Sequence, residues 1–174
     1  MRLLRIHAFP IIEMLLHLCI TPHDVLYDRV QHLSDCRGIQ LRRRLSSPLE
    51  IWLMVKTILI VDDSSLIRRV LSISLSKAGE TLCVEAINGR DGIAKAQLIH
   101  PDLVILDLSM PEMNGLDAAR ELQRIMPAVP LLMFTTQVAS ELEREATRIG
   151  IRKVISKSDG ANAVISSVRT LLAA

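Results

Sequence analysis

The sequence predicts an α/β fold over residues 54–174, a doubly wound five-stranded parallel sheet with helices on both faces. Short apolar runs alternate with stretches of helical periodicity from Thr57 to the C-terminus. Gly and Pro residues stand where the helical stretches end. Because an open parallel sheet places its sites at the carboxyl ends of its strands, those ends are where functional residues are expected.

Five runs of four or five mainly apolar residues are the expected strands, and their composition is typical of strands buried on both faces. They are Thr57–Val61, Leu82–Ala86, Leu103–Leu106, Leu131–Phe134 and Lys153–Ser156. Aromatic residues make up only 2% of the chain, so the core between the sheet and its helices is expected to be aliphatic.

Four of the intervening segments carry an apolar stripe at α-helical spacing, and such a stripe normally faces the core. The stripes are Leu66, Val70 and Ile73; Leu116, Ala119 and Leu122; Leu142, Ala146 and Ile149; and Val164, Ile165, Val168, Leu171 and Leu172. Gly79 and Gly150 are expected to follow the first and fourth helices, and Pro101 to stop the second.

Residues 1–53 are expected to be an N-terminal extension of uncertain order, joined to the domain of residues 54–174 by an Arg-, Ser- and Pro-containing linker. One hypothesis is that Met54 is the real translational start; the other is a partly ordered extension. Four residues of the types that bind zinc also lie here. We favour the interpretation that they are solvated or core side chains rather than a metal site. The set is Cys19, His23, His32 and Cys36.

Charge and hydropathy exclude several classes of protein. The net charge of +2 is too small to indicate a nucleic-acid or membrane-surface partner. No apolar run approaches the ~20 residues that a membrane helix needs. Glu13 and His17 interrupt the apolar N-terminal stretch, and no signal-peptide cleavage site follows it. With three scattered cysteines and no disulfide framework, a cytoplasmic location is expected.

Polar side chains end four of the five expected strands. Asp62 and Asp63 end the first, Asp107 the third, Thr135 the fourth and Lys157 the fifth. Three carboxylates at one edge repel one another unless a cation lies among them, and oxygen-only ligands indicate Mg²⁺. One carboxylate is then a nucleophile towards a phosphoryl group, whose oxygens the ammonium and the hydroxyl stabilise.

These residues, together with the run Asp-Leu-Ser-Met-Pro-Glu-Met-Asn-Gly that starts at Asp107, make residues 56–172 resemble the receiver domain of bacterial two-component response regulators, the CheY-like fold. The resemblance implies a flavodoxin-like sheet of order 2-1-3-4-5. It implies a Mg²⁺ site made by Asp62, Asp63, Asp107 and the backbone carbonyl of Ser109.

By the same resemblance, Asp107 accepts a phosphoryl group from a sensor histidine kinase or a phosphotransfer protein, with Thr135 and Lys157 assisting. The domain is then a phosphoacceptor rather than an enzyme, apart from self-catalysed phosphoryl transfer and dephosphorylation. Because the sequence stops at Ala174, soon after the fifth helix, the output is expected to be contact with a downstream target protein or a relay step.

Two residues depart from the family pattern. Ser158 follows the lysine where the family usually has Pro, and Val154 stands where Tyr or Phe is frequent. An aliphatic side chain cannot reproduce a switch that moves a ring between buried and exposed positions. Phosphorylation is then expected to act by drawing Thr135 inward and shifting the segment after the fourth strand. Ser109 and Gln137, at positions that modulate dephosphorylation in the family, leave the phosphoryl lifetime open.

Two alternatives remain. A phosphatase of the haloacid dehalogenase type also uses an aspartate nucleophile on a parallel α/β fold, but it needs a second Asp two residues later, where this chain has Ser109. A pseudo-receiver, which acts only as an interaction module, is expected to have lost the acidic pair, the acceptor or the lysine. All of these are present here.

Overall fold

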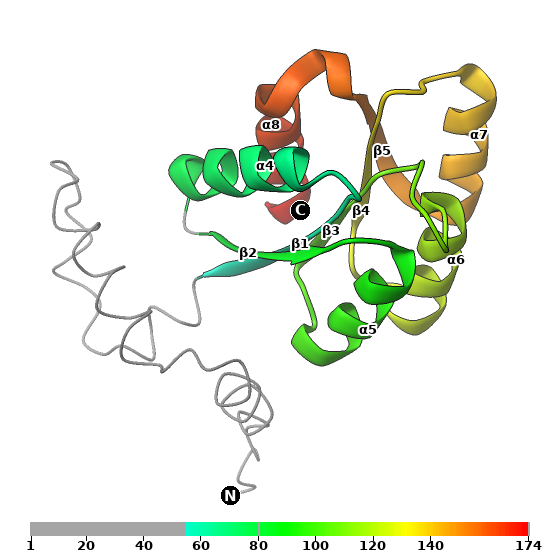
Figure 1. The fold of residues 1–174 in the computed structure, drawn as a ribbon, viewed down its shortest axis with the longest axis horizontal. Helices are drawn as coiled ribbons and strands as arrows, with labels where there is room; N and C mark the ends of the chain where they lie inside the picture. Colours follow the sequence, from blue (N-terminus) through cyan, green and yellow to red (C-terminus); the bar gives the residue numbers. More distant parts are fainter. Residues whose placement is uncertain (1–54, 80, 174) are drawn as a thin grey trace, which may run out of the picture. The chain divides into compact units, whose positions relative to one another are not determined.

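The computed structural model describes residues 55–79 and 81–173. Strands and helices alternate through this region (Figure 1). In chain order they are β1 (Lys56–Val61), α4 (Ser65–Ala78), β2 (Thr81–Ala86), α5 (Gly89–Ile99), β3 (Leu103–Leu106), α6 (Gly115–Ile125), β4 (Leu131–Thr135), α7 (Ser140–Ile149), β5 (Ile151–Ser156), the short 3₁₀ helix η2 (Lys157–Asp159) and α8 (Gly160–Leu172). None of the described helices is long and apolar enough to cross a bilayer.

The predictions made for residues 1–53 lie outside the described residues. These are the N-terminal extension, its linker and the set of cysteines and histidines with zinc-ligand types. Met54, the candidate start, also lies outside them. The division of the chain into an extension and a domain therefore stays a prediction.

The strands form one parallel sheet in the order β2-β1-β3-β4-β5, which confirms the predicted doubly wound fold. The order reverses between β1 and β3, because β2 lies on one side of β1 and β3 on the other. Val61, the last residue of β1, is paired with Leu106, the last residue of β3. The residues that follow these two strands therefore emerge side by side at the switch point of the sheet, where α/β folds of this kind bind ligands.

Helices α4 and α8 lie on one face of the sheet, and α5, α6 and α7 lie on the other (Figure 1). Helices α4 and α8 pack against the first core cluster, in which the strand residues are Ile58, Ile60, Leu103, Ile105, Leu132, Phe134 and Ile155. Helices α5, α6 and α7 pack against the second, which includes Leu59, Val61, Val104, Leu106, Leu131 and Met133. Apart from Phe134 these side chains are all aliphatic, as the composition predicts.

The strand predictions are correct to within two residues, and the differences follow from position in the sheet. The central strands β1, β3 and β4 are almost entirely buried, as predicted for strands covered on both faces. The edge strands β2 and β5 are only partly buried. Strand β5 begins at Ile151, two residues before the predicted start, because the exposed polar pair that follows Ile151 hides its strand character.

The core-facing stripe predicted for the first helix is wrong. Leu66, Val70 and Ile73 are 69%, 44% and 45% exposed, and it is Leu71 and Leu75 that are buried against the sheet. Helix α4 carries two apolar stripes, and spacing alone does not say which one faces the core. The stripes predicted for the third, fourth and fifth helices do pack into the core, on α6, α7 and α8.

Candidate functional site

Three carboxylates meet at the carboxyl ends of β1 and β3. Oxygen atoms of Asp62, Asp63 and Asp107 lie within 4.8 Å of one another, and we refer to these residues as the acidic cluster. Asp62 and Asp107 are 2% and 4% exposed, whereas Asp63 is exposed. The backbone N–H of Asp107 donates to the carbonyl of Val61 (2.8 Å), which extends the β1–β3 ladder by one residue and fixes the acidic cluster to the sheet.

Lys157 supplies the positive charge for the buried part of this cluster. It follows β5, and its Nζ lies 2.8 Å from Asp62 Oδ2 and 3.2 Å from Asp107 Oδ1. The lysine side chain is itself only 14% exposed. One ammonium group therefore compensates two buried carboxylates, and the structure brings together four of the residues that the sequence singles out.

Burial and this ion pair set the protonation of the site. Burial raises the pKa of Asp107 above its ordinary value of 3.8, and the charge and hydrogen bond of Lys157 offset only part of that rise. Burial acts to lower the pKa of Lys157, but the hydrogen bond and charge of Asp62, with a further contribution from Asp107, raise that pKa overall. The lysine is therefore charged at neutral pH, while the Asp107 carboxylate is in an environment that disfavours its ionised form.

Thr135 and Ser109 lie at the same edge of the sheet without a direct bond to the carboxylates. Thr135 ends β4 and is fully buried, and its hydroxyl oxygen accepts a hydrogen bond from the N–H of Gln137 (3.2 Å). It is paired with Ser156, the residue before Lys157, so the end of β4 lies beside the end of β5 that leads to the lysine. Ser109 is exposed in the loop after β3, and within the described residues its carbonyl accepts no hydrogen bond.

The donor set fits a hard divalent cation. Carboxylate oxygens within 4.8 Å of one another, together with an unengaged carbonyl, are the ligands that Mg²⁺ prefers. The orientation of Asp62 is already fixed, because its Oδ1 accepts from the N–H of Ser64 (2.9 Å) and its Oδ2 binds Lys157. A cation at this site would compete with Lys157 for the same oxygens.

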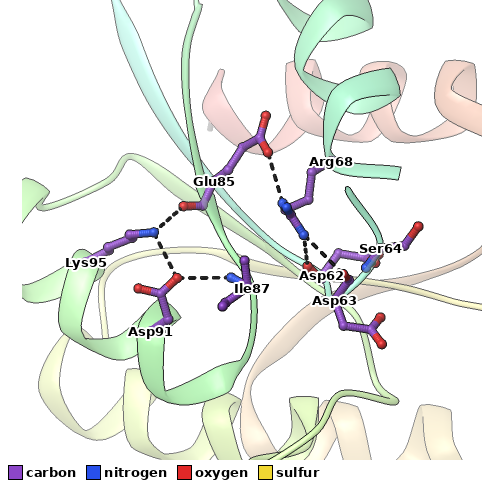
Figure 2. Close-up of polar contacts among 8 residues, drawn as sticks. All are labelled: Asp62, Asp63, Ser64, Arg68, Glu85, Ile87, Asp91 and Lys95. Carbon is purple, nitrogen blue, oxygen red and sulfur yellow. Dashed lines mark hydrogen bonds and ion pairs between the residues drawn. The ribbon is translucent and has the colours of Figure 1, made fainter. Parts of the chain in front are cut away.

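Two structural features of the site were not foreseen from the sequence. At Gly115, the first residue of α6, a Cβ atom would overlap the carbonyl oxygen of Asp107 and lie 2.9 Å from its carbonyl carbon, so only glycine allows this close approach. The second feature is Arg68, whose guanidinium donates to the backbone carbonyls of Asp62 and Asp63, the acidic pair (Figure 2). The glycine that closes the run from Asp107 could have indicated the close approach at Gly115. No pattern in the sequence indicates the contact of Arg68.

Comparisons with known proteins agree with this geometry. A family model described as the response regulator receiver domain matches residues 58–169. The chemotaxis protein CheY of Thermotoga maritima is 36% identical over 104 residues, which cover 60% of this chain and 87% of that protein. Among solved structures, the chemotaxis protein CheY4 of Vibrio cholerae aligns with a TM-score of 0.63 and 28% identity, over 67% of this chain and 98% of that one.

A second kind of relative is larger. A protein-glutamate methylesterase/protein-glutamine glutaminase of Archaeoglobus fulgidus is 38% identical over 112 residues, and the chain covers 32% of its length. The response regulator domain of Thermotoga maritima CheB aligns with a TM-score of 0.64 over 98% of that domain, at 23% identity, which shows a shared fold. The family match begins in β1 and ends in α8, so it includes every strand end that contributes to the site. This chain therefore belongs to the response regulator receiver domain family.

Proposed function

We propose that this protein is a phosphorylation-dependent response regulator in which Asp107 accepts a phosphoryl group from a sensor histidine kinase or a phosphotransfer protein. The observation that carries the proposal is the convergence of the acidic cluster with Lys157, whose Nζ contacts both buried carboxylates. A structural salt bridge needs one carboxylate. Two buried carboxylates on one lysine, with the carboxylate of Asp63 within 4.8 Å of both, are the arrangement that a metal-assisted phosphoryl transfer requires.

In the proposed reaction, a carboxylate oxygen of Asp107 attacks the phosphorus of the donor as the bond from phosphorus to the donor's nitrogen breaks. The electron pair of that bond stays with the imidazole of the donor, and the product is an acyl phosphate on Asp107. Bound Mg²⁺ would neutralise negative charge on the phosphoryl oxygens. Lys157 binds one phosphoryl oxygen as a point charge. The Thr135 hydroxyl, whose oxygen accepts from the N–H of Gln137, donates its own hydrogen to a second phosphoryl oxygen.

Asp62, Asp63, Asp107 and the carbonyl of Ser109 are the proposed ligands of Mg²⁺. Asp63 is the exposed member of the cluster, which suits a ligand at the solvent-facing side of a site that keeps several waters. The proposed output is contact with a downstream target protein, with no direct binding of nucleic acid or membrane. A cytoplasmic location fits this proposal.

The test is the reaction of the full chain with acetyl phosphate and Mg²⁺, followed by intact mass measurement. The proposal expects one added phosphoryl group in the wild type, none without Mg²⁺ and none in Asp107→Asn. No added mass in the wild type, or unchanged labelling of Asp107→Asn, would sink the assignment of the acceptor. Limited proteolysis of the labelled protein locates the group to the peptide that contains Asp107.

The two alternatives give different results when phosphate release from a simple monoester is measured beside the acetyl phosphate reaction. A haloacid dehalogenase-type phosphatase would turn over a simple phosphate monoester repeatedly, and the position where its acid/base Asp should stand holds the exposed Ser109. A pseudo-receiver would take up no phosphoryl group. The proposal expects a single addition per chain and no steady release of phosphate from a monoester.

A further inference from the structure

We propose that Arg68 is a positioning residue for the metal site, acting through the backbone of the acidic pair rather than on the metal itself. This inference rests on the proposed function, in which Asp62 and Asp63 bind Mg²⁺. Arg68 lies in α4, and its side chain turns back towards the loop that carries the pair (Figure 2). It is not a metal ligand, because a guanidinium has donors and no acceptor.

The guanidinium makes three bonds that together join two elements to the loop. Its Nη1 donates to the carbonyl of Asp62 (2.8 Å) and to the carbonyl of Asp63 (3.2 Å), and its Nε donates to Glu85 Oε2 on β2 (2.9 Å). The Arg68 side chain is only 12% exposed, although Glu85 is 42% exposed. Hydrogen bonds from a charged donor in such a partly buried position are stronger than those between neutral groups.

These bonds fix the orientation of the two peptide groups that follow Asp62 and Asp63. The directions of both side chains depend on those peptide planes, because each Cα–Cβ bond is set by the backbone on either side of it. Glu85 in turn is held from the far face of the sheet, since Lys95 of α5 donates to its carbonyl (2.7 Å) and pairs with Asp91 (2.8 Å). The acidic loop is therefore held by contacts that reach both α4 and α5.

Two effects of Arg68 on Mg²⁺ binding have opposite signs, which makes the inference testable. As a positive charge beside the site, the guanidinium repels a divalent cation, so removal of the charge alone would strengthen Mg²⁺ binding. As a support for the ligands, it pre-orients them, so its loss would weaken Mg²⁺ binding. Loss of residues that orient metal ligands typically costs 10–100-fold in metal affinity. We expect the support to outweigh the repulsion.

The experiment measures Mg²⁺ binding by titration calorimetry on the full chain, for Arg68→Gln, Arg68→Lys and Arg69→Gln. Arg69 is the matched control, because it is the next residue of the same helix, is exposed, and within the described residues forms no side-chain hydrogen bond or ion pair. We expect both Arg68 variants to raise the Mg²⁺ dissociation constant about tenfold. The lysine variant keeps the charge but not the planar set of donors. Arg69→Gln should change the constant by less than about twofold.

A second readout does not involve the metal. The N–H of Ser64 donates to Asp62 Oδ1, so its hydrogen exchange reports on the order of the acidic loop. We expect faster exchange at Ser64 in both Arg68 variants than in wild type or Arg69→Gln. Arg68→Gln binding Mg²⁺ as tightly as wild type, or Arg68→Lys matching wild type in both readouts, would overturn the inference. A wild type that binds Mg²⁺ but takes up no phosphoryl group would instead refute only the proposed function.

Discussion

Replacing Lys157 with Met should show how far the site depends on one buried cation. The substitution keeps an unbranched side chain of similar length and removes the ammonium that contacts Asp62 at 2.8 Å and Asp107 at 3.2 Å. Both carboxylates are then left buried, 2% and 4% exposed, without a partner of opposite charge. An uncompensated buried charge is among the most destabilising changes that a single substitution makes.

The expected magnitude follows from the two distances. At an effective dielectric constant of ~20, the attractions amount to about 6 kcal/mol for the Asp62 contact and about 5 kcal/mol for the Asp107 contact. The cost of burying the lysine opposes them, and it disappears in the variant. Breaking a buried ion pair by removing one member costs about 3–5 kcal/mol in measured cases. Because Lys157 keeps 14% of its side chain exposed, we expect the lower end, about 3 kcal/mol, near neutral pH without metal.

The loss should depend on pH and on Mg²⁺ in a defined direction. Burial already holds the pKa of Asp107 above 3.8, and without Lys157 that pKa rises further. Between its unfolded and its folded pKa, the native state binds more protons than the unfolded state, so stability increases as the pH falls. The difference between variant and wild type should therefore shrink towards acidic pH. Saturating Mg²⁺ should shrink it as well, since the cation compensates the same carboxylates.

The assay is urea unfolding of the full chain at neutral and acidic pH, with and without Mg²⁺. Lys153→Met is the control, because Lys153 is an exposed residue within β5, the strand that leads to Lys157, and, in the described part of the chain, has no side-chain partner. It should change stability by well under 1 kcal/mol. Equal stability of Lys157→Met and wild type without metal at neutral pH would refute the reasoning, as would a loss that grows at acidic pH.

Three further predictions concern the same domain. Gly115→Ala should lower the free energy of unfolding by about 3 kcal/mol, because the added Cβ meets the backbone of Asp107 and lies 3.0 Å from Leu108 Cα. The rate of labelling by acetyl phosphate should fall in the same variant. Asp107→Asn should stabilise the metal-free protein near neutral pH in urea unfolding, since burial raises the pKa of Asp107 and so disfavours the charge that the substitution removes. The gain should vanish as the pH falls towards 3.8. Glu145→Gln removes the surface ion pairs with Arg120 and Arg148, so the thermal midpoint should not move measurably.

The sheet could be predicted because a strand that is buried on both faces consists almost entirely of apolar residues. A central strand such as Leu103–Leu106 has no polar residue at all, so its bounds in the structure equal the predicted ones. The sequence of helix α4 does not indicate in the same way which of its residues are buried. Its apolar residues occupy two stripes, and only the packing of α4 against β1, β2 and α8 decides that Leu71 and Leu75 are inside while Leu66 is outside.

The site could be predicted to the extent that topology alone brings its members together. Asp62 and Asp107 follow adjacent parallel strands, so their proximity follows from the sheet order. The contact between Arg68 and Glu85 has no such origin. The two residues are separated by 17 positions, on a helix and an edge strand, and their meeting depends on the register of β2 against β1 and on the rotation of α4. Neither quantity is encoded in residue spacing.

The two departures from the family pattern, Ser158 and Val154, have different consequences in the structure. Where receivers usually carry Pro after the lysine, Ser158 donates its N–H to Ser156 Oγ (3.2 Å) and the two hydroxyls lie 2.7 Å apart, so side-chain hydrogen bonds hold the turn that directs Lys157. The loss of Pro therefore does not displace the lysine. No other group takes over the role of the ring that Val154 replaces. Val154 is a partly buried aliphatic residue in the same core cluster as Leu142 of α7. A structural change at Thr135 would thus reach α7 through aliphatic packing rather than through a rotating ring.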